Sequence, residues 1–330
     1  MQRIAVIGAG AWGTALAEML AAGGRDVRLW CRRPALAERI TAGRENADYL
    51  AGLRLSANLT ATAAAADLGD AELVLMVTPA QALGEVAAAL APHLPPAAPV
   101  LICAKGIERE SLRLMSEVAE AVLPGRPLAV LSGPTFATEV ARGLPTAVTL
   151  ACRDEALGRQ LVQAVGRPHF RPYLSDDLVG AQIGGALKNI IAIACGIVEG
   201  RRLGENARAA LMTRGLAEML RFGRAKGAQA QTLMGLSGLG DLALTCNSAR
   251  SRNMSLGIAL GQGGKAEAIL ANRPTVTEGV ATAAAVVRAA RELKLEMPIA
   301  AAVDRICNAG GEIESEIGGL LSRPFTVEGA

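Results

Sequence analysis

Aromatic residues are scarce in this chain of 330 residues, at 2% of the total. The core must therefore be built from Ala, Leu, Val and Ile, and a hydrophobic share of 51% is ample for a large one. The same shortage argues against binding of single-stranded nucleic acid, because that function uses aromatic side chains as stacking platforms for bases. The length predicts two domains.

Histidine, paired cysteines and long apolar runs are lacking as well. His93 and His169 stand beside prolines and are expected in loops, and six scattered cysteines without a Cys-x-x-Cys motif argue against a metal site. The longest apolar run, 190–198, is far shorter than the roughly 20 residues that a membrane span needs. A net charge of +3, with both signs interspersed, gives no case for a nucleic-acid or membrane-surface partner. The scattered cysteines favour a reducing cytoplasm. We expect no signal peptide, since the first strand begins at Arg3.

A glycine motif near the amino terminus is the strongest feature that the sequence does contain. Residues 4–7 predict a buried strand, Gly8, Gly10 and Gly13 follow as Gly-x-Gly-x-x-Gly, and residues 14–20 favour a helix. Gly8 would allow a tight turn, Gly10 a close approach of the backbone to a pyrophosphate, and Gly13 close packing of the helix on the strand. This order of strand, loop and helix predicts a dinucleotide-binding site at the helix N-terminus.

Strands and helices alternate through the first half of the chain, which predicts a Rossmann-type, mostly parallel sheet in an α/β protein. Lys105 and the segment 133–135 lie at the carboxyl ends of two predicted strands, and ligands of such sheets bind beyond those ends. We therefore expect both beside the glycine motif. Strands are expected at 26–32, 71–79, 99–106, 128–135, 146–152 and 170–173, with helix and then loop over 35–60.

The end of the second strand carries Arg32 and Arg33, where a protein that prefers NAD has an acidic residue for the ribose hydroxyls. An acid would repel a 2′-phosphate, whereas a guanidinium group attracts it. The sequence therefore predicts NADP(H) as the preferred cofactor, with NAD(H) possible. The alternative is that both arginines are simply solvated in a loop.

Helical periodicity replaces the strand patterns beyond residue 176, so we predict a dinucleotide-binding domain over 1–175 and an all-α domain over 176–330. The first helix of this second domain carries Lys188 on a face of small residues that includes Gly184 and Gly185. A partly desolvated lysine there would have a lowered pKa and could shuttle a proton. Alternatively, the lysine extends to solvent and the glycines serve close helix packing.

A second cluster, Ser251, Arg252 and Asn253, opens a short predicted helix. A helix N-terminus beside arginine suits a phosphate group. The alternative is an ordinary capped surface helix with solvated arginines. In the same way, residues 275–278 fit a capping box in which Glu278 would be purely structural.

Seven short motifs, in order along nearly the whole chain, resemble the family of bacterial NAD(P)-dependent glycerol-3-phosphate dehydrogenases. They are GAGAWGTAL at 8–16, AKGIE at 104–108, SGPTFA at 132–137, LKN at 187–189, GLGDL at 238–242, SRN at 251–253 and TEGV at 277–280. The resemblance implies reversible conversion of dihydroxyacetone phosphate to sn-glycerol 3-phosphate for phospholipid synthesis. It also implies a homodimer.

The resemblance implies roles for individual residues. Lys188 matches the family's proton-transferring lysine. The positions that match substrate contacts are Lys105, Gly133, Thr135, Lys188, Asp241, Ser251, Arg252 and Asn253. The glycine motif and the positions that match cofactor contacts comprise Gly8, Gly10, Ala11, Trp12, Gly13, Arg32, Arg33, Tyr49, Lys105, Ala137, Arg252, Val276 and Glu278. Asp241 could orient Lys188 or bind a substrate hydroxyl, and the sequence leaves both open.

Three positions depart from the family pattern. Ala11 and Thr135 stand where serine is common, and Arg33 stands where histidine is common, which strengthens the argument for a 2′-phosphate. Related dehydrogenases that act on 3-hydroxy acids or on ketopantoate are alternatives, as are a non-catalytic NADP sensor and a structural protein of the same fold. A sensor would not need Lys105, Lys188 and Asp241.

Overall fold

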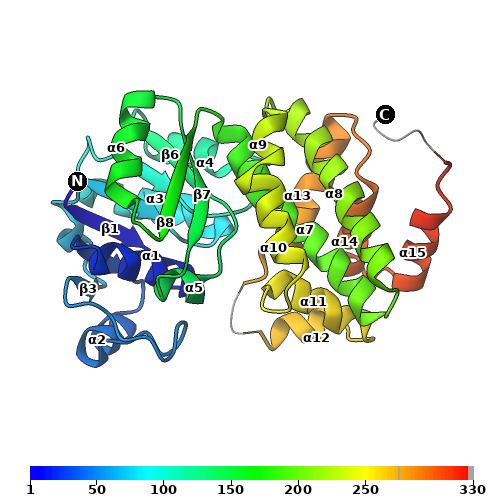
Figure 1. Ribbon diagram of the computed structural model, residues 1–330, viewed down its shortest axis with the longest axis horizontal. Helices are drawn as coiled ribbons and strands as arrows, with labels where there is room; N and C mark the ends of the chain where they lie inside the picture. The colour runs from blue at the N-terminus through cyan, green and yellow to red at the C-terminus, as the bar shows by residue number, and fades with distance from the viewer. Residues whose placement is uncertain (274–275, 326–330) are drawn as a thin grey trace.

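The computed structural model describes residues 1–273 and 276–325, which form a sheet domain followed by a helical domain (Figure 1). The predicted fold class, an α/β chain with a Rossmann-type domain before an all-α domain, is confirmed. The eight strands run in the order β3-β2-β1-β4-β5-β6-β7-β8, parallel except where β7 meets β6 antiparallel. Their bounds are β1 Arg3–Ile7, β2 Asp26–Trp30, β3 Leu59–Thr62, β4 Leu73–Met76, β5 Val100–Ile102, β6 Leu128–Ser132, β7 Thr146–Cys152 and β8 Phe170–Ser175.

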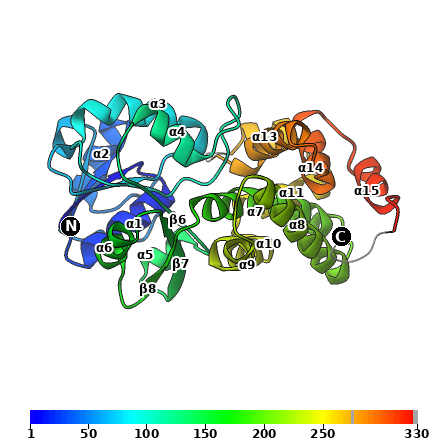
Figure 2. The ribbon, with the colours of Figure 1, turned by 90° about the horizontal axis from the view of Figure 1, so that it is seen from above.

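Helices cover both faces of the sheet, so its central strands are apolar on both sides. Along β4, Leu73 and Leu75 pack into one core while Val74 and Met76 pack into the other. Figure 2 shows α3 and α4 over one face and α1 and α6 over the other. The helices of this domain are α1 Ala11–Ala22, α2 Pro34–Gly43, α3 Leu83–Leu90, α4 Met115–Val122, α5 Ala137–Ala141 and α6 Glu155–Val165.

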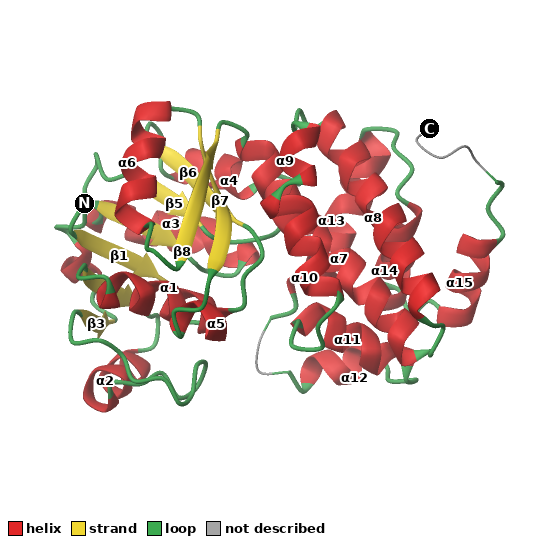
Figure 3. Cartoon of the chain, viewed as in Figure 1, coloured by secondary structure: helices red, strands yellow, loops and turns green. Residues whose placement is uncertain are grey.

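The helical domain is built around one long helix, α7 (Leu178–Gly200), and most of the other helices of that domain pack around it (Figure 3). Asp177 caps its N-terminus by accepting a hydrogen bond from the Gly180 amide. By length and hydropathy α7 could cross a membrane, but 89% of its apolar window is buried inside the protein, as expected of a core helix. The helices that pack on it are α8 Glu205–Ala225, α9 Ala230–Met234, α10 Asp241–Cys246, α11 Arg252–Gly261, α13 Glu278–Glu292 and α14 Pro298–Asn308. Two further helices lie outside these: α12 Ala266–Ala271 packs on α11 and α14, and α15 Ile313–Leu321 packs on α14.

Glycines let α7 and α11 pack with their backbones in contact. A methyl group at Gly196 would collide with the Met254 carbonyl oxygen, and one at Gly257 would collide with the Ile193 carbonyl oxygen. Such close packing leaves little freedom for one helix to slide along the other. The start of α11 is therefore held at a fixed place relative to Lys188 on α7.

Two local predictions are wrong. The loop expected up to residue 60 instead runs into β3, which begins at Leu59; β3 is a four-residue edge strand of threonine, alanine and one leucine, too short for a clear hydrophobic period. The capping box is also wrong, because α13 begins at Glu278 with Thr277 as its N-cap, so Glu278 occupies the first helical position rather than the third. Thr275, the predicted cap, lies outside the described residues.

Candidate active site

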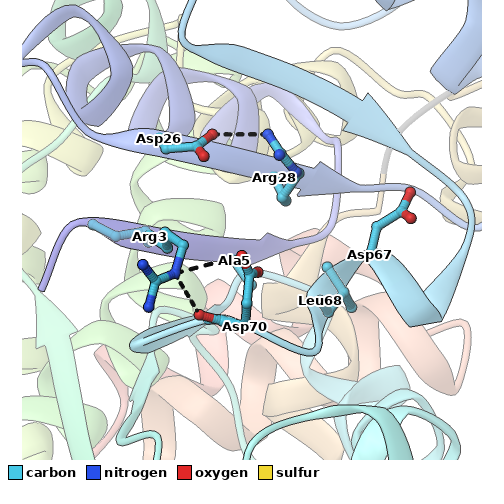
Figure 4. Close-up of a pocket in the computed structure, with 9 residues that line it drawn as sticks. Arg3, Ala5, Asp26, Arg28, Asp67, Leu68 and Asp70 are labelled. Atoms are coloured by element: carbon cyan, nitrogen blue, oxygen red, sulfur yellow. Dashed lines mark hydrogen bonds and ion pairs between the residues drawn. The ribbon is translucent and has the colours of Figure 1, made fainter.

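The amino-terminal edge of the sheet holds a small pocket, shown in Figure 4, whose charged groups already pair with one another. Arg3 Nε lies 3.4 Å from Asp70 Oδ2, and Arg28 Nη1 lies 2.7 Å from Asp26 Oδ1. The predicted site residues lie instead at the opposite edge, beyond the carboxyl ends of the strands. We therefore place the candidate active site at that edge.

The glycine loop between β1 and α1 has the backbone geometry that the motif predicts. Gly8 has φ +114°, and a methyl group there would lie 2.8 Å from the Val77 carbonyl oxygen. A methyl group at Gly13 would collide with the Gly8 carbonyl oxygen, so the helix packs directly on the turn. At Gly10 nothing lies within 4 Å of that position, so the loop is open at the α1 N-terminus. This open position suits a pyrophosphate group.

Asn46 braces this loop, and sequence reasoning missed it. Its buried Nδ2 donates hydrogen bonds to the Ala9 carbonyl at 2.9 Å and to Thr14 Oγ1 at 2.7 Å. The amide thus ties the 44–55 segment to the glycine loop. A lone asparagine in a polar stretch carries no sequence signal of such a contact.

The end of β2 presents the two arginines and the predicted tyrosine together. Arg33 Nη2 lies 3.4 Å from both the Tyr49 hydroxyl and Asp48 Oδ2, while Arg32 is exposed. Arg39 binds the same Asp48 oxygen at 2.6 Å. Asp48 is therefore shared by Arg33 and Arg39. The Arg33 side chain is 54% exposed, so its guanidinium group can bind another anion.

Asp241, fully buried at the start of α10, joins two lysines from different domains. Its Oδ1 lies 2.7 Å from Lys188 Nζ on α7, and its Oδ2 lies 2.6 Å from Lys105 Nζ beyond β5. Lys105 also donates a hydrogen bond to the Gly133 carbonyl at 3.0 Å, which Thr135 Oγ1 contacts at 3.3 Å. One network thus holds five predicted substrate-site residues.

Lys188 does not extend to solvent, since only 7% of it is exposed. Desolvation lowers its pKa to about 8, an effect opposed by Asp241 and reinforced by Lys105. Its ammonium group donates a second hydrogen bond to Thr245 Oγ1 at 2.8 Å. Thr245, also missed from the sequence, stands one helical turn after Asp241 and so reaches the same ammonium group.

The glycines beside Lys188 allow other segments to approach α7. A methyl group at Gly184 would collide with the Ser237 carbonyl, and one at Gly185 would lie 2.7 Å from Ser132 Oγ. Ser237 belongs to the π-turn Leu236–Gly240 that leads into α10. Close packing at Gly184 therefore places Asp241 against Lys188.

The start of α11 carries a serine that caps the helix and an exposed arginine. Ser251 Oγ accepts a hydrogen bond from the Met254 amide at 3.2 Å, and Arg252, at the first helical position, is exposed. Asn253 is already engaged: its Nδ2 donates to Asn189 Oδ1 at 2.8 Å, and its Oδ1 accepts from the Gly279 amide at 3.0 Å. It joins α7, α11 and α13.

Glu278 reaches back to the sheet domain. Its Oε1 accepts a hydrogen bond from the Ala80 amide at 3.2 Å, while its Oε2 is buried and has no partner among residues 1–273 and 276–325. Burial raises the pKa of this carboxyl group. Trp12, in the first turn of α1, has a buried indole nitrogen that likewise bonds to nothing in the described part of the chain. Buried polar atoms of this kind are ordinarily satisfied, so both suit a bound polar ligand.

The remaining predicted positions are less tightly placed. Ala11 and Ala137 are the first residues of α1 and α5, and Val276, just before α13, is 50% exposed. None of the three carries a polar side chain. Any ligand contact by them would be through backbone or apolar atoms.

A dinucleotide-binding loop, a buried lysine paired with a carboxylate beyond the carboxyl edge of the sheet, and a separate helical domain are typical of a nicotinamide-dependent oxidoreductase. Two family models match the chain: the N-terminus of NAD-dependent glycerol-3-phosphate dehydrogenase over residues 3–158 and its C-terminus over residues 177–317. The chain belongs to this family.

Individual relatives agree with that assignment. A glycerol-3-phosphate dehydrogenase [NAD(P)+] of Rhodospirillum rubrum is 58% identical over 100% of this chain and 95% of the relative. A glycerol-3-phosphate dehydrogenase [NAD(P)+] of Parvibaculum lavamentivorans is 53% identical over 99% of this chain and 98% of the relative. The crystal structure of glycerol-3-phosphate dehydrogenase from Coxiella burnetii superposes with a TM-score of 0.94 at 39% identity, covering 98% of this chain and 99% of that one.

Proposed function

We propose that this chain catalyses the reversible reduction of dihydroxyacetone phosphate to sn-glycerol 3-phosphate with NAD(P)H, and that Lys188 transfers the proton. The observation that carries the proposal is the buried Lys188 ammonium group, held by Asp241 and Thr245 at the edge of the sheet where the glycine loop lies. The direct test is consumption of NADPH by the purified protein, measured with and without dihydroxyacetone phosphate.

The cofactor would bind along the carboxyl edge of the sheet. The open backbone at Gly10 would receive its pyrophosphate, and the unpaired atoms of Trp12 and Glu278 would contact its polar groups. Bound there, the nicotinamide would supply the hydride. The other proposed cofactor-binding residues are Gly8, Ala11, Gly13, Arg32, Arg33, Tyr49, Lys105, Ala137, Arg252 and Val276.

The substrate phosphate would bind where α11 begins. The first turn of a helix presents amide groups that lack intrahelical partners, and Arg252 adds a positive charge beside those of α11. Held at that end, the ketone would lie toward Lys188, because Asn253 ties α11 to α7 through Asn189. Binding energy from the remote phosphate would thereby position the reacting carbonyl. The proposed substrate-binding residues are Lys105, Gly133, Thr135, Lys188, Asp241, Ser251, Arg252 and Asn253.

In the reduction, negative charge develops on the ketone oxygen, and the Lys188 ammonium group would donate a proton to it. Lys105, held by the same carboxylate, would add positive charge nearby. In the oxidation, the neutral amine of Lys188 would remove the proton from the substrate hydroxyl. Asp241 would also orient both lysines, since each of its carboxylate oxygens is paired with one of them.

Several finer properties belong to the same proposal. The exposed Arg32 and the partly free Arg33 support a preference for NADPH over NADH, since both could reach a 2′-phosphate. The boundary between the domains would lie between β8, which ends at Ser175, and α7, which begins at Leu178. We further propose a cytoplasmic homodimer that supplies phospholipid synthesis.

A further inference from the structure

One side chain outside the reaction centre binds across the two domains at three points. Arg250, in the turn before α11, places Nη1 2.5 Å from Glu139 Oε1 and donates from Nη2 to Thr138 Oγ1 at 2.5 Å. Its guanidinium carbon also lies 4.6 Å from the centre of the Phe136 ring. All three partners belong to α5 or the residue before it.

The two segments that Arg250 joins each carry proposed substrate contacts. Arg250 directly precedes Ser251 and Arg252, where the phosphate would bind, and α5 directly follows the loop of Gly133 and Thr135. A change in the distance between these segments would therefore change the distance between the phosphate site and the sheet edge.

The position of these contacts suits a closure device. Figure 2 shows α10 and α13 on opposite sides of α7, with α5 on the side of α10. On the α13 side, Arg288 Nη1 donates to the Arg109 carbonyl at 2.7 Å and Glu278 accepts from Ala80. Arg250 and α5 thus join the domains on the other side of the long helix.

We propose that Arg250 is a positioning residue: with Phe136, Thr138 and Glu139 it forms an interdomain latch that holds the two domains together around bound substrate and cofactor. The substrate named in this inference comes from the proposed function, whereas the contacts of Arg250 with Phe136, Thr138 and Glu139 do not depend on it. The side chains of Arg250 and Glu139 are 53% and 38% exposed, so each contact is weak and can open in every turnover. For a ligand that binds only the closed form, the apparent Kd equals the intrinsic Kd divided by the closed fraction, so binding weakens as the closed form becomes rarer.

The test compares Arg250→Ala with the charge-swapped double variant Arg250→Glu/Glu139→Arg. We expect Arg250→Ala to raise KM for dihydroxyacetone phosphate roughly 5-fold while kcat changes less than about twofold, from the size of such contacts. The double variant restores KM to within about twofold of the wild-type value, and 0.5 M salt raises the wild-type KM toward that of Arg250→Ala. The matched control is Arg305→Ala, because Arg305 is also 53% exposed and paired with Glu316, but within the helical domain.

An unchanged KM in Arg250→Ala, a fall in kcat alone, or a double variant no better than its single variants overturns the latch and leaves the proposed function intact. If the wild-type protein does not turn over dihydroxyacetone phosphate at all, the proposed function fails instead. The latch is then decided by small-angle scattering of the ligand-free proteins: a larger radius of gyration for Arg250→Ala supports it, and an identical one overturns it.

Discussion

Lys188 Nζ lies 2.7 Å from Asp241 Oδ1, inside a site where the carboxylate is fully buried. The second oxygen of the same carboxylate binds Lys105 from the other domain at 2.6 Å. One anion between two cations therefore sets the position of Lys188 relative to the sheet edge. This arrangement is the basis of the predictions on catalysis.

Lys188→Ala removes the proposed proton donor without touching the glycine loop. We expect kcat to fall at least about 1,000-fold, because general acid catalysis and charge stabilisation are lost together. Fluorescence titration should still show NADPH binding with nearly the wild-type Kd. Lys265→Ala, which changes an exposed lysine before α12, is the control. Substantial turnover by Lys188→Ala contradicts the proposed role of this lysine.

The pH dependence of the two directions follows from the lowered pKa of Lys188, about 8. Ketone reduction needs the ammonium form, so kcat/KM for reduction is highest below pH 8 and falls as the pH rises through it. Alcohol oxidation needs the neutral amine, so its kcat/KM rises over the same range. Stopped-flow rates in both directions from pH 6 to 10 measure the two profiles.

Asp241→Asn tests whether electrostatics at Lys188 set the pH at which the reduction rate has fallen to half, the midpoint of the profile. Asp241 raises the pKa of Lys188 against desolvation and Lys105, so its removal lowers the pKa and moves the midpoint of the reduction profile to lower pH. Loss of the carboxylate also leaves two ammonium groups without their shared anion and costs about 3 kcal/mol or more of stability. A midpoint that stays in place means that the profile reports another group.

Arg32→Ala/Arg33→Ala should weaken NADPH binding about tenfold or more and leave NADH binding nearly unchanged, since only NADPH carries the 2′-phosphate. Calorimetric Kd values for both cofactors give the comparison. Arg39→Ala is the matched control, because Arg39 binds the same Asp48 oxygen as Arg33. Equal losses for the two cofactors refute the preference.

Glu218 is a second titrating group, away from the active site. Its carboxylate accepts hydrogen bonds from the Ile299 and Ala300 amides at the start of α14, and burial raises its pKa to about 7. The native protein then binds a proton more tightly than the unfolded chain, so this group's contribution to stability falls by about 3 kcal/mol as the pH rises from 4.5 to 7. Urea unfolding across that range should show a smaller fall for Glu218→Gln; an identical fall means that the carboxyl group does not titrate there.

The sequence predicted the fold well where the physics is local. The run 4–7 and the glycines after it predicted β1, the turn and α1, and the helix predicted to carry Lys188 at the start of the second domain is α7. β3 was not predicted because an edge strand of four residues has no distinctive hydrophobic period. The start of α13 was predicted two residues too early because a threonine, which suits a helix N-cap, stands at both 275 and 277.

The site was harder to predict, since its geometry depends on contacts between distant segments. The motifs named Lys188 and Asp241, but the contact between them depends on the π-turn packing against Gly184. Thr245 and Asn46 are ordinary polar residues whose hydrogen bonds exist only in the folded chain. The sequence likewise could not show that the Asn253 amide is already bonded on both of its atoms.

The measurement that tests the central claim most directly is the fall of NADPH absorbance with purified protein, with dihydroxyacetone phosphate and without it, and with NADH in parallel. We predict rapid decay only in the presence of the phosphorylated ketone, and faster decay with NADPH than with NADH. No decay with dihydroxyacetone phosphate, in a protein that still binds NADPH by fluorescence, would contradict the proposed reaction.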